Sequence, residues 1–519
     1  MIFLKNKYLY YVPLIFICSY YIFQSYFFGI HDFANYFFGG KFLNEGIFNE
    51  DIYFPYHFNK TITDFGYQNI FVSYAPNTPF LSIFFWIFSF FKIGASKLIF
   101  NSISSVLFIV SIYRLSNYHK IELKYILLLP FIFFIPIKNN LLFGQVYFLL
   151  FFLLSEGYLA YQKQYYKSLA VFWSLAIFLK VFPILFVMYL VFKKEYVATI
   201  YLTISCIILL LFSVFITGIN VWLFYFSSVL NRANNGEIAG AFVDNYQSYY
   251  MFFKRLFVYD EMYNKNPLIN LPKVFTFVIL FLKFLLIGAG IFITRKERNT
   301  ILAFSFWAFI SILISPYGST YSFILLLFLG ITLAEKTTDF NHKSLGFVLL
   351  FCIANSNLIP KVSFTINYTR LFFLTALLLL FVWNYRKQIP FKKLFLSTVI
   401  LIIITSFFKT EKTHFNTVLK TPILTYDYKV ENNKISYSFW NENGENFKTE
   451  NYTYQSLNSD AIEIIDNQIY YNQKQITFDN SNKKKAILIN NKKIMFLSDA
   501  NLGIGFYGIK ELAYIVIHK

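Results

Sequence analysis

Asp32 is the residue whose type and position best suit chemistry, because it follows the first apolar run of membrane length directly. Behind it, residues 33–43 form an amphipathic run with paired glycines that would lie along a membrane surface. A carboxylate at the lipid–water boundary can act on a lipid-borne substrate without the full cost of burial in hydrocarbon. It could be a general base that accepts a proton from a hydroxyl, or an N-cap of the following helix. Spacing alone leaves both interpretations open.

Other polar patches interrupt the apolar sequence where the chain should reach the same face. Residues 139–145 carry two asparagines and Gln145, whose amides could bind sugar hydroxyls or satisfy helix ends. Residues 244–248 follow an aromatic segment, a combination that suits carbohydrate but also occurs at any membrane interface. Residues 315–318 read as a tight turn between two apolar blocks. Further ionisable candidates on this side are Lys41, Glu45, Lys180, Asp244 and Lys138.

The sequence contains no motif that predicts a metal or nucleotide cofactor. The six histidines show no ligand spacing, and no glycine-rich phosphate-binding loop is present. Cys18, Cys206 and Cys352 lie far apart in apolar segments, where they are expected to pack as small hydrophobic residues. We therefore expect no cofactor.

The elements that must position these residues are membrane helices. The 519 residues are 57% hydrophobic and only 14% charged, and the apolar blocks are long enough to cross a bilayer. The net charge of +19 does not indicate nucleic-acid binding, because the basic residues cluster in short loops such as 295–298 and 386–393, as cytoplasmic loops do. The apolar blocks fall at about 8–30, 76–92, 97–116, 124–138, 145–161, 168–192, 197–217, 273–293, 300–315, 319–334, 343–357, 368–385 and 394–408.

The positive-inside rule gives an expected orientation. Lys5 and Lys7 place the N-terminus in the cytoplasm, ahead of an uncleaved first helix, so that residues 31–75 form the first outer loop. The loops at 218–272 and 355–367 also lie outside in this scheme. All of the candidate residues then share one side of the membrane.

Two blocks do not read as simple spans. Residues 168–192 are interrupted by Lys180 and Pro183, which favours two half-length helices in a re-entrant hairpin over one kinked helix with a snorkelling lysine. Basic residues from Arg114 onward should be inside, which leaves 76–92 as a partial or interfacial segment. The number of crossings between residues 76 and 116 stays open at this stage.

The composition changes after Lys409. Residues 410–519 hold no run of membrane length, only short apolar stretches between Asn-rich turns, which predict strands and hairpins. We expect a membrane domain over 1–409, with amphipathic helices in 31–75, and a soluble β-rich domain over 410–519 on the same side as Asp32.

The order of the motifs resembles a known family. An Asp-Phe-x-x-Tyr-x-x-Gly-Gly-Lys run begins at Asp32, and further motifs follow in the order Tyr74-Ala75-Pro76, Gly144-Gln145, Leu179-Lys180-x-x-Pro183, Asp244-Asn245-Tyr246-Gln247-Ser248 and Ser315-Pro316. Over roughly residues 8–390 this pattern is similar to glycosyltransferase family 87, the polyprenyl-phosphate-mannose-dependent mannosyltransferases.

The resemblance implies an α-helical polytopic membrane protein with the class C glycosyltransferase fold, here with about 11–13 hydrophobic segments. The β-rich domain expected over residues 410–519 lies outside the family pattern, and the resemblance says nothing about it. It implies an inverting transferase that moves a hexose, mannose in the family, from a polyprenyl-phosphate carrier to a lipid or glycan hydroxyl. The expected setting is the periplasmic side of a bacterial inner membrane, among membrane lipids and without nucleic acid. Asp32 would be the general base and Lys180 would meet the carrier phosphate. The remaining predicted substrate-binding residues are Tyr36, Lys41, Tyr74, Gln145, Asn245, Gln247 and Ser315.

One departure keeps alternatives open. Family members often carry a Trp and one or two histidines after the Ser-Pro turn, whereas residues 318–322 contain no histidine. A catalytically altered member, a scaffold, or another class C transferase acting on protein or lipid A would also fit. A lipid or solute transporter or flippase is a further alternative, against which the absence of an internal repeat counts. The sequence says nothing of the oligomeric state or of the role of residues 410–519.

Overall fold

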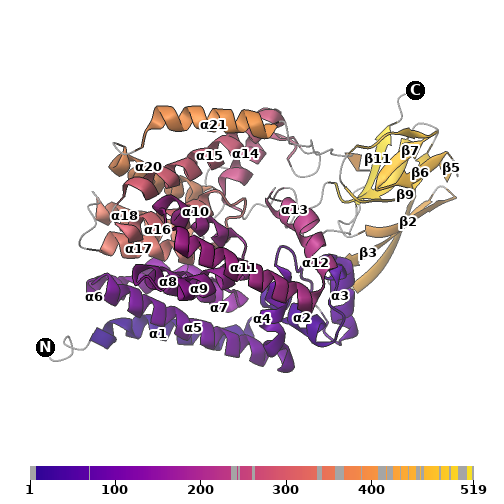
Figure 1. Cartoon of the computed structure of the whole chain (residues 1–519). Coiled ribbons are helices and arrows are strands. Elements are labelled where there is room, and N and C mark those ends of the chain that lie inside the picture. The colour runs from indigo at the N-terminus through magenta and orange to yellow at the C-terminus, as the bar shows by residue number, and fades with distance from the viewer. Residues whose placement is uncertain are drawn as a thin grey trace.

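The protein consists of a helical body with a region of β-sheet at one end (Figure 1). The computed structural model describes residues 7–68, 70–234, 236, 242, 246–259, 264–297, 299–335, 342–356, 368–386, 389–406, 416–417, 425–432, 434–441, 444–451, 456–457, 461–478, 481–489, 493–500 and 511–516.

The helices follow one another closely along the chain. The first half contains η2 (Lys7–Tyr11), α1 (Val12–Phe27), α2 (Phe33–Asn44), η3 (Glu50–Tyr53), α3 (Pro55–Asp64), α4 (Pro79–Trp86), η4 (Ile87–Phe90), α5 (Ile93–Tyr118), α6 (Leu123–Ile132), α7 (Phe134–Phe143), α8 (Tyr147–Gln162), α9 (Tyr166–Leu179), η5 (Phe182–Ile184), α10 (Leu185–Lys193) and α11 (Tyr196–Thr217). The second half contains α12 (Ile219–Phe224), the π-helix η6 (Tyr225–Val229), α13 (Leu230–Asn234), α14 (Tyr249–Phe257), α15 (Pro272–Lys296), α16 (Thr300–Leu313), η7 (Thr320–Leu326), α17 (Leu327–Ala334), α18 (Lys343–Asn355), α20 (Thr369–Tyr385) and α21 (Phe391–Ser406).

The long helices run between two ends of the body. At one end the Lys97 ammonium donates to the Gly29 carbonyl at 2.9 Å, and at the other the Tyr11 and Ser116 hydroxyls lie 2.7 Å apart, so α1 and α5 are antiparallel. We name these the Asp32 end, which also carries Gln145 and Lys180, and the Glu335 end, which also carries Glu195 and Glu297. The β-sheet region lies at the Asp32 end, on the right of Figure 1, and the N-terminus lies at the other.

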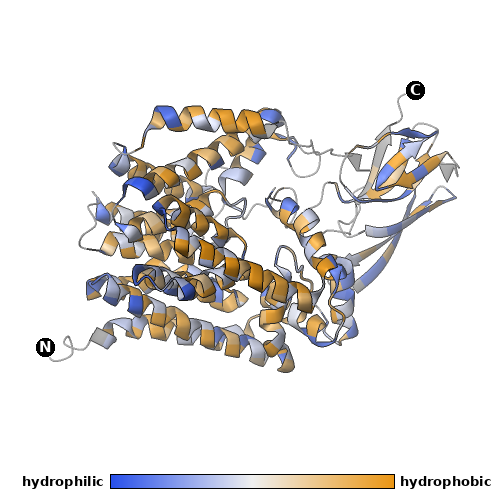
Figure 2. Ribbon diagram, in the orientation of Figure 1, coloured by the Kyte–Doolittle hydropathy of each residue, from blue (hydrophilic) through white to orange (hydrophobic). Residues whose placement is uncertain are grey.

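Membrane-spanning capacity is concentrated in a few helices. By length and composition, α5, α11 and α15 could each cross a membrane, and α6 with α7, bent by 58° at Phe133, could form a fourth span. The other apolar blocks fold into shorter helices, because breaks such as Lys180–Val181 and Ser315–Ser319 interrupt them. The predicted apolar blocks are therefore helical, but many are shorter than a straight span of roughly 20 residues. Apolar side chains dominate these helices (Figure 2), and the chain is an integral membrane protein.

The block at 168–192 folds as a hairpin, as favoured from the sequence. Near the Glu335 end, the Tyr166 hydroxyl at the start of α9 donates to Glu195, just beyond the end of α10, at 3.3 Å. Trp173 of α9 contacts both Phe186 and Tyr189 of α10, so the two half-length helices lie antiparallel. Lys180 consequently stands at the tip of the hairpin, because Pro183 and the extended backbone at Lys180 end α9 there.

The segment at 76–92 likewise stays short. It forms only α4 and the following turn η4, both at the Asp32 end, before α5 turns toward the Glu335 end. α4 packs against α2 and α9 rather than running the length of the body. This agrees with a partial segment and removes the conflict in the orientation of residues 76–116.

The C-terminal part contains the predicted β-structure. The strands are β1 (Asn416–Thr417), β2 (Thr425–Glu431), β3 (Lys434–Asn441), β4 (Gly444–Asn451), β5 (Ser456–Leu457), β6 (Ile462–Ile465), β7 (Gln468–Tyr471), β8 (Lys474–Gln475), β9 (Lys483–Ile489), β10 (Lys493–Ser498) and β11 (Glu511–Val516). They form antiparallel sheets in the orders β1-β11-β10-β9-β5, β2-β3-β4 and β6-β7-β8. Ile435 and Tyr437 of β3 pack with Met495 and Leu497 of β10 in one of their cores.

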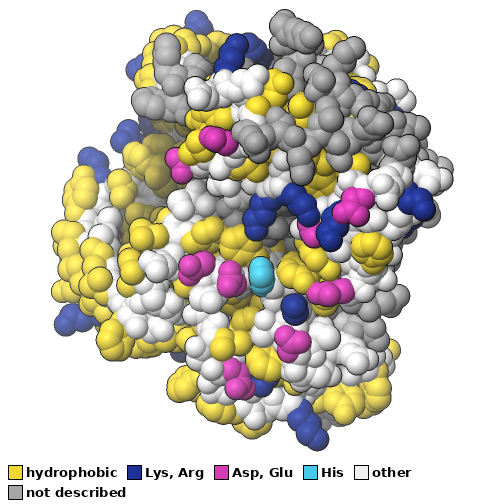
Figure 3. Space-filling view, turned by 90° about the vertical axis from the view of Figure 1, so that its right-hand side faces the viewer, with side chains coloured by type: hydrophobic (Ala, Val, Ile, Leu, Met, Phe, Trp, Pro, Cys, Tyr) yellow, Lys and Arg dark blue, Asp and Glu magenta, His cyan; other side chains and the backbone are white. Residues whose placement is uncertain are grey.

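Within the described residues, the β-sheet region contacts α3 and α13 of the helical body. The Tyr56 hydroxyl of α3 donates to Glu445 at 2.5 Å, and its ring lies 4.6 Å from that of Tyr426. Arg232 of α13 lies 3.4 Å from the fully buried carboxylate of Asp499. Figure 3 shows this end of the molecule, where side chains of both charges lie across the face and hydrophobic ones gather along one flank.

Candidate active site

Two adjacent glycines bring the helix behind Asp32 into contact with α4. A Cβ atom at Gly40 would lie 2.5 Å from the Phe85 carbonyl oxygen, and one at Gly39 would lie 2.6 Å from Tyr74 and Ser82 side-chain atoms. Such distances are too short for any other residue, so the backbones of α2 and α4 approach closely only with glycine here. The Gly-Gly pair thereby fixes α2, and with it Asp32, against the body.

The Gly144-Gln145 pair has an equally specific reason. Gly144 ends α7 with φ of +66°, a left-handed conformation that favours glycine. A Cβ atom there would also lie 2.8 Å from the Cβ of Phe33. The turn therefore places Gln145 directly beside the start of α2.

A chain of hydrogen bonds ends on Asp32. The Tyr36 hydroxyl donates to Gln145 Oε1 at 2.7 Å, which orients the amide so that Gln145 Nε2 donates to Asp32 Oδ2 at 2.6 Å. Asp32 occupies the N-cap position of α2, but its side chain makes no capping hydrogen bond. Of the two interpretations left open by the sequence, the structure therefore disfavours the helix cap.

Lys180 is held nearby at the hairpin tip. Its ammonium donates to Asn77 Oδ1 at 3.0 Å and lies 5.6 Å from the centre of the Tyr36 ring. The Tyr53 hydroxyl donates to the Asn77 carbonyl at 2.8 Å and so fixes the residue that holds Lys180. The lysine, the tyrosine and the carboxylate thus form one connected polar group.

Opposing electrostatic effects act on the pKa of Asp32. Burial raises the pKa of the Asp32 carboxyl, whereas the Gln145 hydrogen bond and the charges of Lys180, His31 and Lys97 oppose that rise. Burial and the Lys97 charge lower the pKa of His31. A carboxyl group with a raised pKa and a positive neighbour is a proton acceptor suited to general base catalysis.

These groups face a cavity of about 830 Å³. That volume lies within the range of small-molecule sites, roughly 300–1,000 Å³. Asp32, Tyr36, Gln145, Lys180 and Ser315 all line it, so the structure brings together five of the predicted residues. Further polar and aromatic lining comes from Asn35, Asn77, Tyr147, Tyr246, Tyr317, Ser319 and Tyr321.

Other predicted residues lie away from this cavity. Lys41 pairs with Glu45 at 2.9 Å on the same helix and lies over the Phe65 ring, because it points to the opposite side of α2 from Tyr36. Tyr74 is buried, and its hydroxyl donates to the Thr78 carbonyl at 2.8 Å. Neither side chain is among the described residues that line the cavity.

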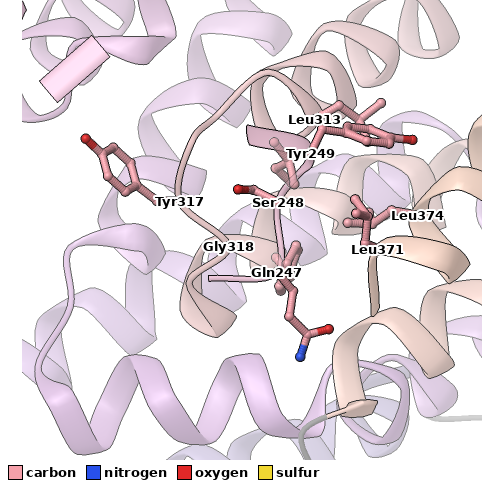
Figure 4. Close-up of a pocket in the computed structure, with 10 residues that line it drawn as sticks. Gln247, Ser248, Tyr249, Leu313, Tyr317, Gly318, Leu371 and Leu374 are labelled. Atoms are coloured by element: carbon pink, nitrogen blue, oxygen red, sulfur yellow. The ribbon is translucent and has the colours of Figure 1, made fainter. Parts of the chain in front are cut away.

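Gln247 also lies elsewhere, and Asn245 is outside the described residues. Gln247 is buried beside Gly318 and its side chain points away from Tyr317 (Figure 4). Its Oε1 accepts a hydrogen bond from the Arg370 backbone at 2.9 Å. Gln247 therefore joins the start of α20, through its side chain, to the loop before η7, through its backbone, and it is not among the residues that line the 830 Å³ cavity.

Several lining residues were missed in the sequence. Asn77 follows the Tyr74-Ala75-Pro76 motif directly, and Tyr147 follows Gly144-Gln145 by two positions, so both lie within two residues of a recognised motif. Lys283 gave a stronger signal, since it is a lone charge within an apolar block. Among the described residues, no three His, Cys, Asp or Glu side chains gather as metal ligands would.

Comparison with known proteins agrees with the motif pattern. The model of glycosyltransferase family 87 matches residues 75–316, which include Asn77, Gln145, Lys180 and Ser315. Asp32 and Tyr36 precede the matched segment. No curated protein and no solved structure matches the chain. The match confirms the resemblance: residues 75–316 are similar to glycosyltransferase family 87.

Proposed function

We propose that this membrane glycosyltransferase has the class C fold and moves a hexose from a polyprenyl-phosphate carrier to a lipid or glycan hydroxyl, with inversion at the sugar. The observation that carries the proposal is the Asp32 carboxylate, held by Gln145 and faced by Lys180, in a cavity of about 830 Å³ at one end of an apolar helical body. A donor whose lipid tail stays in the membrane can reach such a position.

The reaction is a single displacement. The acceptor hydroxyl oxygen attacks the anomeric carbon and the bond from that carbon to the phosphate oxygen breaks, so polyprenyl phosphate leaves. Asp32 accepts the hydroxyl proton, and Lys180 stabilises the negative charge that develops on the phosphate. The amide of Gln145 keeps the carboxylate oriented toward the acceptor.

The orientation in the membrane follows from the same proposal. The Asp32 end faces the outer, periplasmic side of a bacterial inner membrane and the Glu335 end faces the cytoplasm, where the basic loops lie. The β-sheet region then lies outside with the site, since it contacts α3 and α13 at the Asp32 end.

The test is transfer of labelled sugar from polyprenyl-phosphate-hexose by the purified full chain in proteoliposomes. We expect Asp32→Asn to abolish transfer, because an amide cannot accept the hydroxyl proton. Asp64→Asn, an exposed acid at the end of α3, is the matched control and should retain wild-type transfer. Full activity of Asp32→Asn would overturn the general base. Movement of an intact lipid across the vesicle without sugar transfer would favour a flippase instead.

A further inference from the structure

Lys283 is a charged residue inside one of the candidate membrane spans. It lies within α15, and residues 274–294 of that helix contain no other charged side chain. Ten residues separate it from Lys273 at the start of the helix, a rise of about 15 Å. An ionisable residue so far inside a candidate span points to a functional role.

Helix packing puts Lys283 at the level of the site. α15 and α16 are antiparallel, because the Trp307 indole donates to the Thr294 hydroxyl at 2.8 Å and a Cβ atom at Gly290 would meet Ile310. Lys283 lies two turns before Gly290, about 10 Å along the axis. That is the level at which α16 ends at Leu313 and the Ser315 turn begins.

The surroundings of Lys283 differ from those of Lys180, although both line the same cavity. Lys180 lies in the polar part, bonded to Asn77 and next to Asp32. Lys283 comes from α15, which packs against α10 and α16, and these two helices together with η5 contribute apolar lining to the cavity. That lining consists of Ile184, Leu185, Ile312 and Ile314.

We propose, on the basis of the proposed function, that Lys283 binds the phosphate of the polyprenyl-phosphate donor from its lipid side. The apolar side chains next to it receive the first isoprene units. The charge of the donor phosphate changes during the reaction, and this supports a role for two lysines. The donor phosphodiester carries one negative charge, whereas the departing phosphate monoester carries nearly two at neutral pH. Lys180 and Lys283 together match the charge of the leaving group, and each would make a charge-assisted hydrogen bond.

Two measurements on the full chain in proteoliposomes test this proposal. The first is sugar transfer, with KM determined separately for donor and acceptor. The second is photolabelling by a polyprenyl phosphate without sugar that carries a diazirine in its first isoprene unit, with the matching polyprenol as competitor. The variants are Lys283→Met and Lys283→Arg, with Lys273→Met, an exposed position in the first turn of α15, as control.

We expect Lys283→Met to raise the donor KM about ten- to a hundredfold, the effect of losing one charged hydrogen bond, and to leave the acceptor KM unchanged. Photolabelling should fall by a similar factor, Lys283→Arg should restore much of both, and Lys273→Met should behave as wild type. Polyprenol should compete poorly against the phosphate probe.

The two proposals fail in different ways. Wild-type transfer with unchanged donor KM and labelling in both Lys283→Met and Lys283→Arg would overturn the role of Lys283 and leave the transferase intact. An absence of transfer by the wild type, together with phosphate-dependent labelling that Lys283→Met removes, would overturn the transferase but support the lipid-phosphate site. If Lys283→Met does not fold, the test uses Lys283→Arg. An affinity of this variant for polyprenol that is tenfold lower than its affinity for the phosphate probe supports the site. Equal affinity for the two lipids contradicts it.

Discussion

The two ends of the helical body use charged residues differently. At the Glu335 end, carboxylates bind neighbouring side chains. A Glu335 oxygen lies 2.8 Å from the His119 ring nitrogen, and a Glu156 oxygen lies 2.9 Å from the Arg114 guanidinium. At the Asp32 end, Asp32 and Lys180 each hydrogen-bond an amide, and among the described residues neither forms an ion pair. Both face the large cavity instead.

The charged residues at the Glu335 end hold helices together, whereas those at the Asp32 end are available to a substrate. A carboxylate whose oxygens already bind neighbouring side chains has little capacity left to accept a proton, but its loss leaves those side chains without that acceptor. A carboxylate oriented by one neutral amide keeps its charge and an oxygen for another molecule. We therefore expect substitutions at the Glu335 end to change stability and substitutions at the Asp32 end to change the reaction.

The largest expected difference is between Asp32→Asn and Glu156→Gln. Removing the general base should lower the rate of sugar transfer by about 10²–10⁴-fold, whereas Glu156→Gln should retain transfer within about twofold per folded molecule, since it lies at the other end. Initial rates in proteoliposomes, normalised to folded protein, measure both. Comparable losses of transfer rate in the two variants would contradict the distinction between a catalytic Asp32 end and a structural Glu335 end.

A large effect on stability is expected from Glu335→Ala. The substitution removes the acceptor for the His119 ring nitrogen and for the Asn299 amide at 2.7 Å. Two half-buried groups without that partner should cost about 2–5 kcal/mol in total, seen as a lower apparent unfolding temperature in detergent. Glu122→Ala, which breaks the more exposed pair with Lys124, is the control and should change the unfolding temperature little. Equal losses would show that burial is not the deciding factor.

A moderate effect is expected from Gly40→Ala. The new methyl group would meet the Phe85 carbonyl, so α2 must move away from α4 at a cost of about 1–3 kcal/mol. Because α2 carries Asp32, donor turnover should fall together with the unfolding temperature. Gly94→Ala on α5, where a Cβ atom would make only ordinary contact with Tyr26 at 3.6 Å, should alter neither. A wild-type turnover number for Gly40→Ala would contradict the positioning role of the glycine pair.

The smallest expected effect is a shift in pH dependence. The base acts when deprotonated, so the raised pKa of Asp32 predicts that activity is lost on acidification at a higher pH than for an ordinary aspartate. The Gln145 hydrogen bond lowers that pKa, and Gln145→Ala should move the acid limb of kcat/KM further upward. Asn139→Ala, whose amide contacts Thr320 instead, should leave the limb in place. A downward shift for Gln145→Ala would show that the hydrogen bond favours the protonated form.

Prediction from the sequence succeeded where the signal was local. Apolar blocks gave helices, short apolar stretches between Asn-rich turns gave strands, and the Lys180–Pro183 break gave the hairpin. Each of these depends on hydropathy, periodicity or backbone constraints over a few neighbouring residues. The family was identified because its motifs are short and ordered along the chain.

The site was predictable only in part, because whether a residue lines the cavity depends on the direction in which its side chain points. Tyr36 and Lys41 lie on one helix, yet only Tyr36 faces the cavity, and Gln247 turns toward the Arg370 backbone. Lys283 joins the cavity from a helix more than a hundred residues beyond Lys180. No local sequence pattern predicts which face α15 turns toward the cavity when it packs on α16.

The sequence by itself determined a helical membrane protein with a carboxylate behind its first helix and a β-rich C-terminal region, because chain-local hydropathy and turn chemistry encode these features. Only the tertiary structure decided that Gln145 orients Asp32, that Asn77 holds Lys180 and that Lys283 lines the same cavity. The physical reason is that those hydrogen bonds join residues 113 and 103 positions apart, and Lys283 comes from a still later helix. They exist only once close backbone contacts, such as that of Gly40 with Phe85, fix how the helices pack.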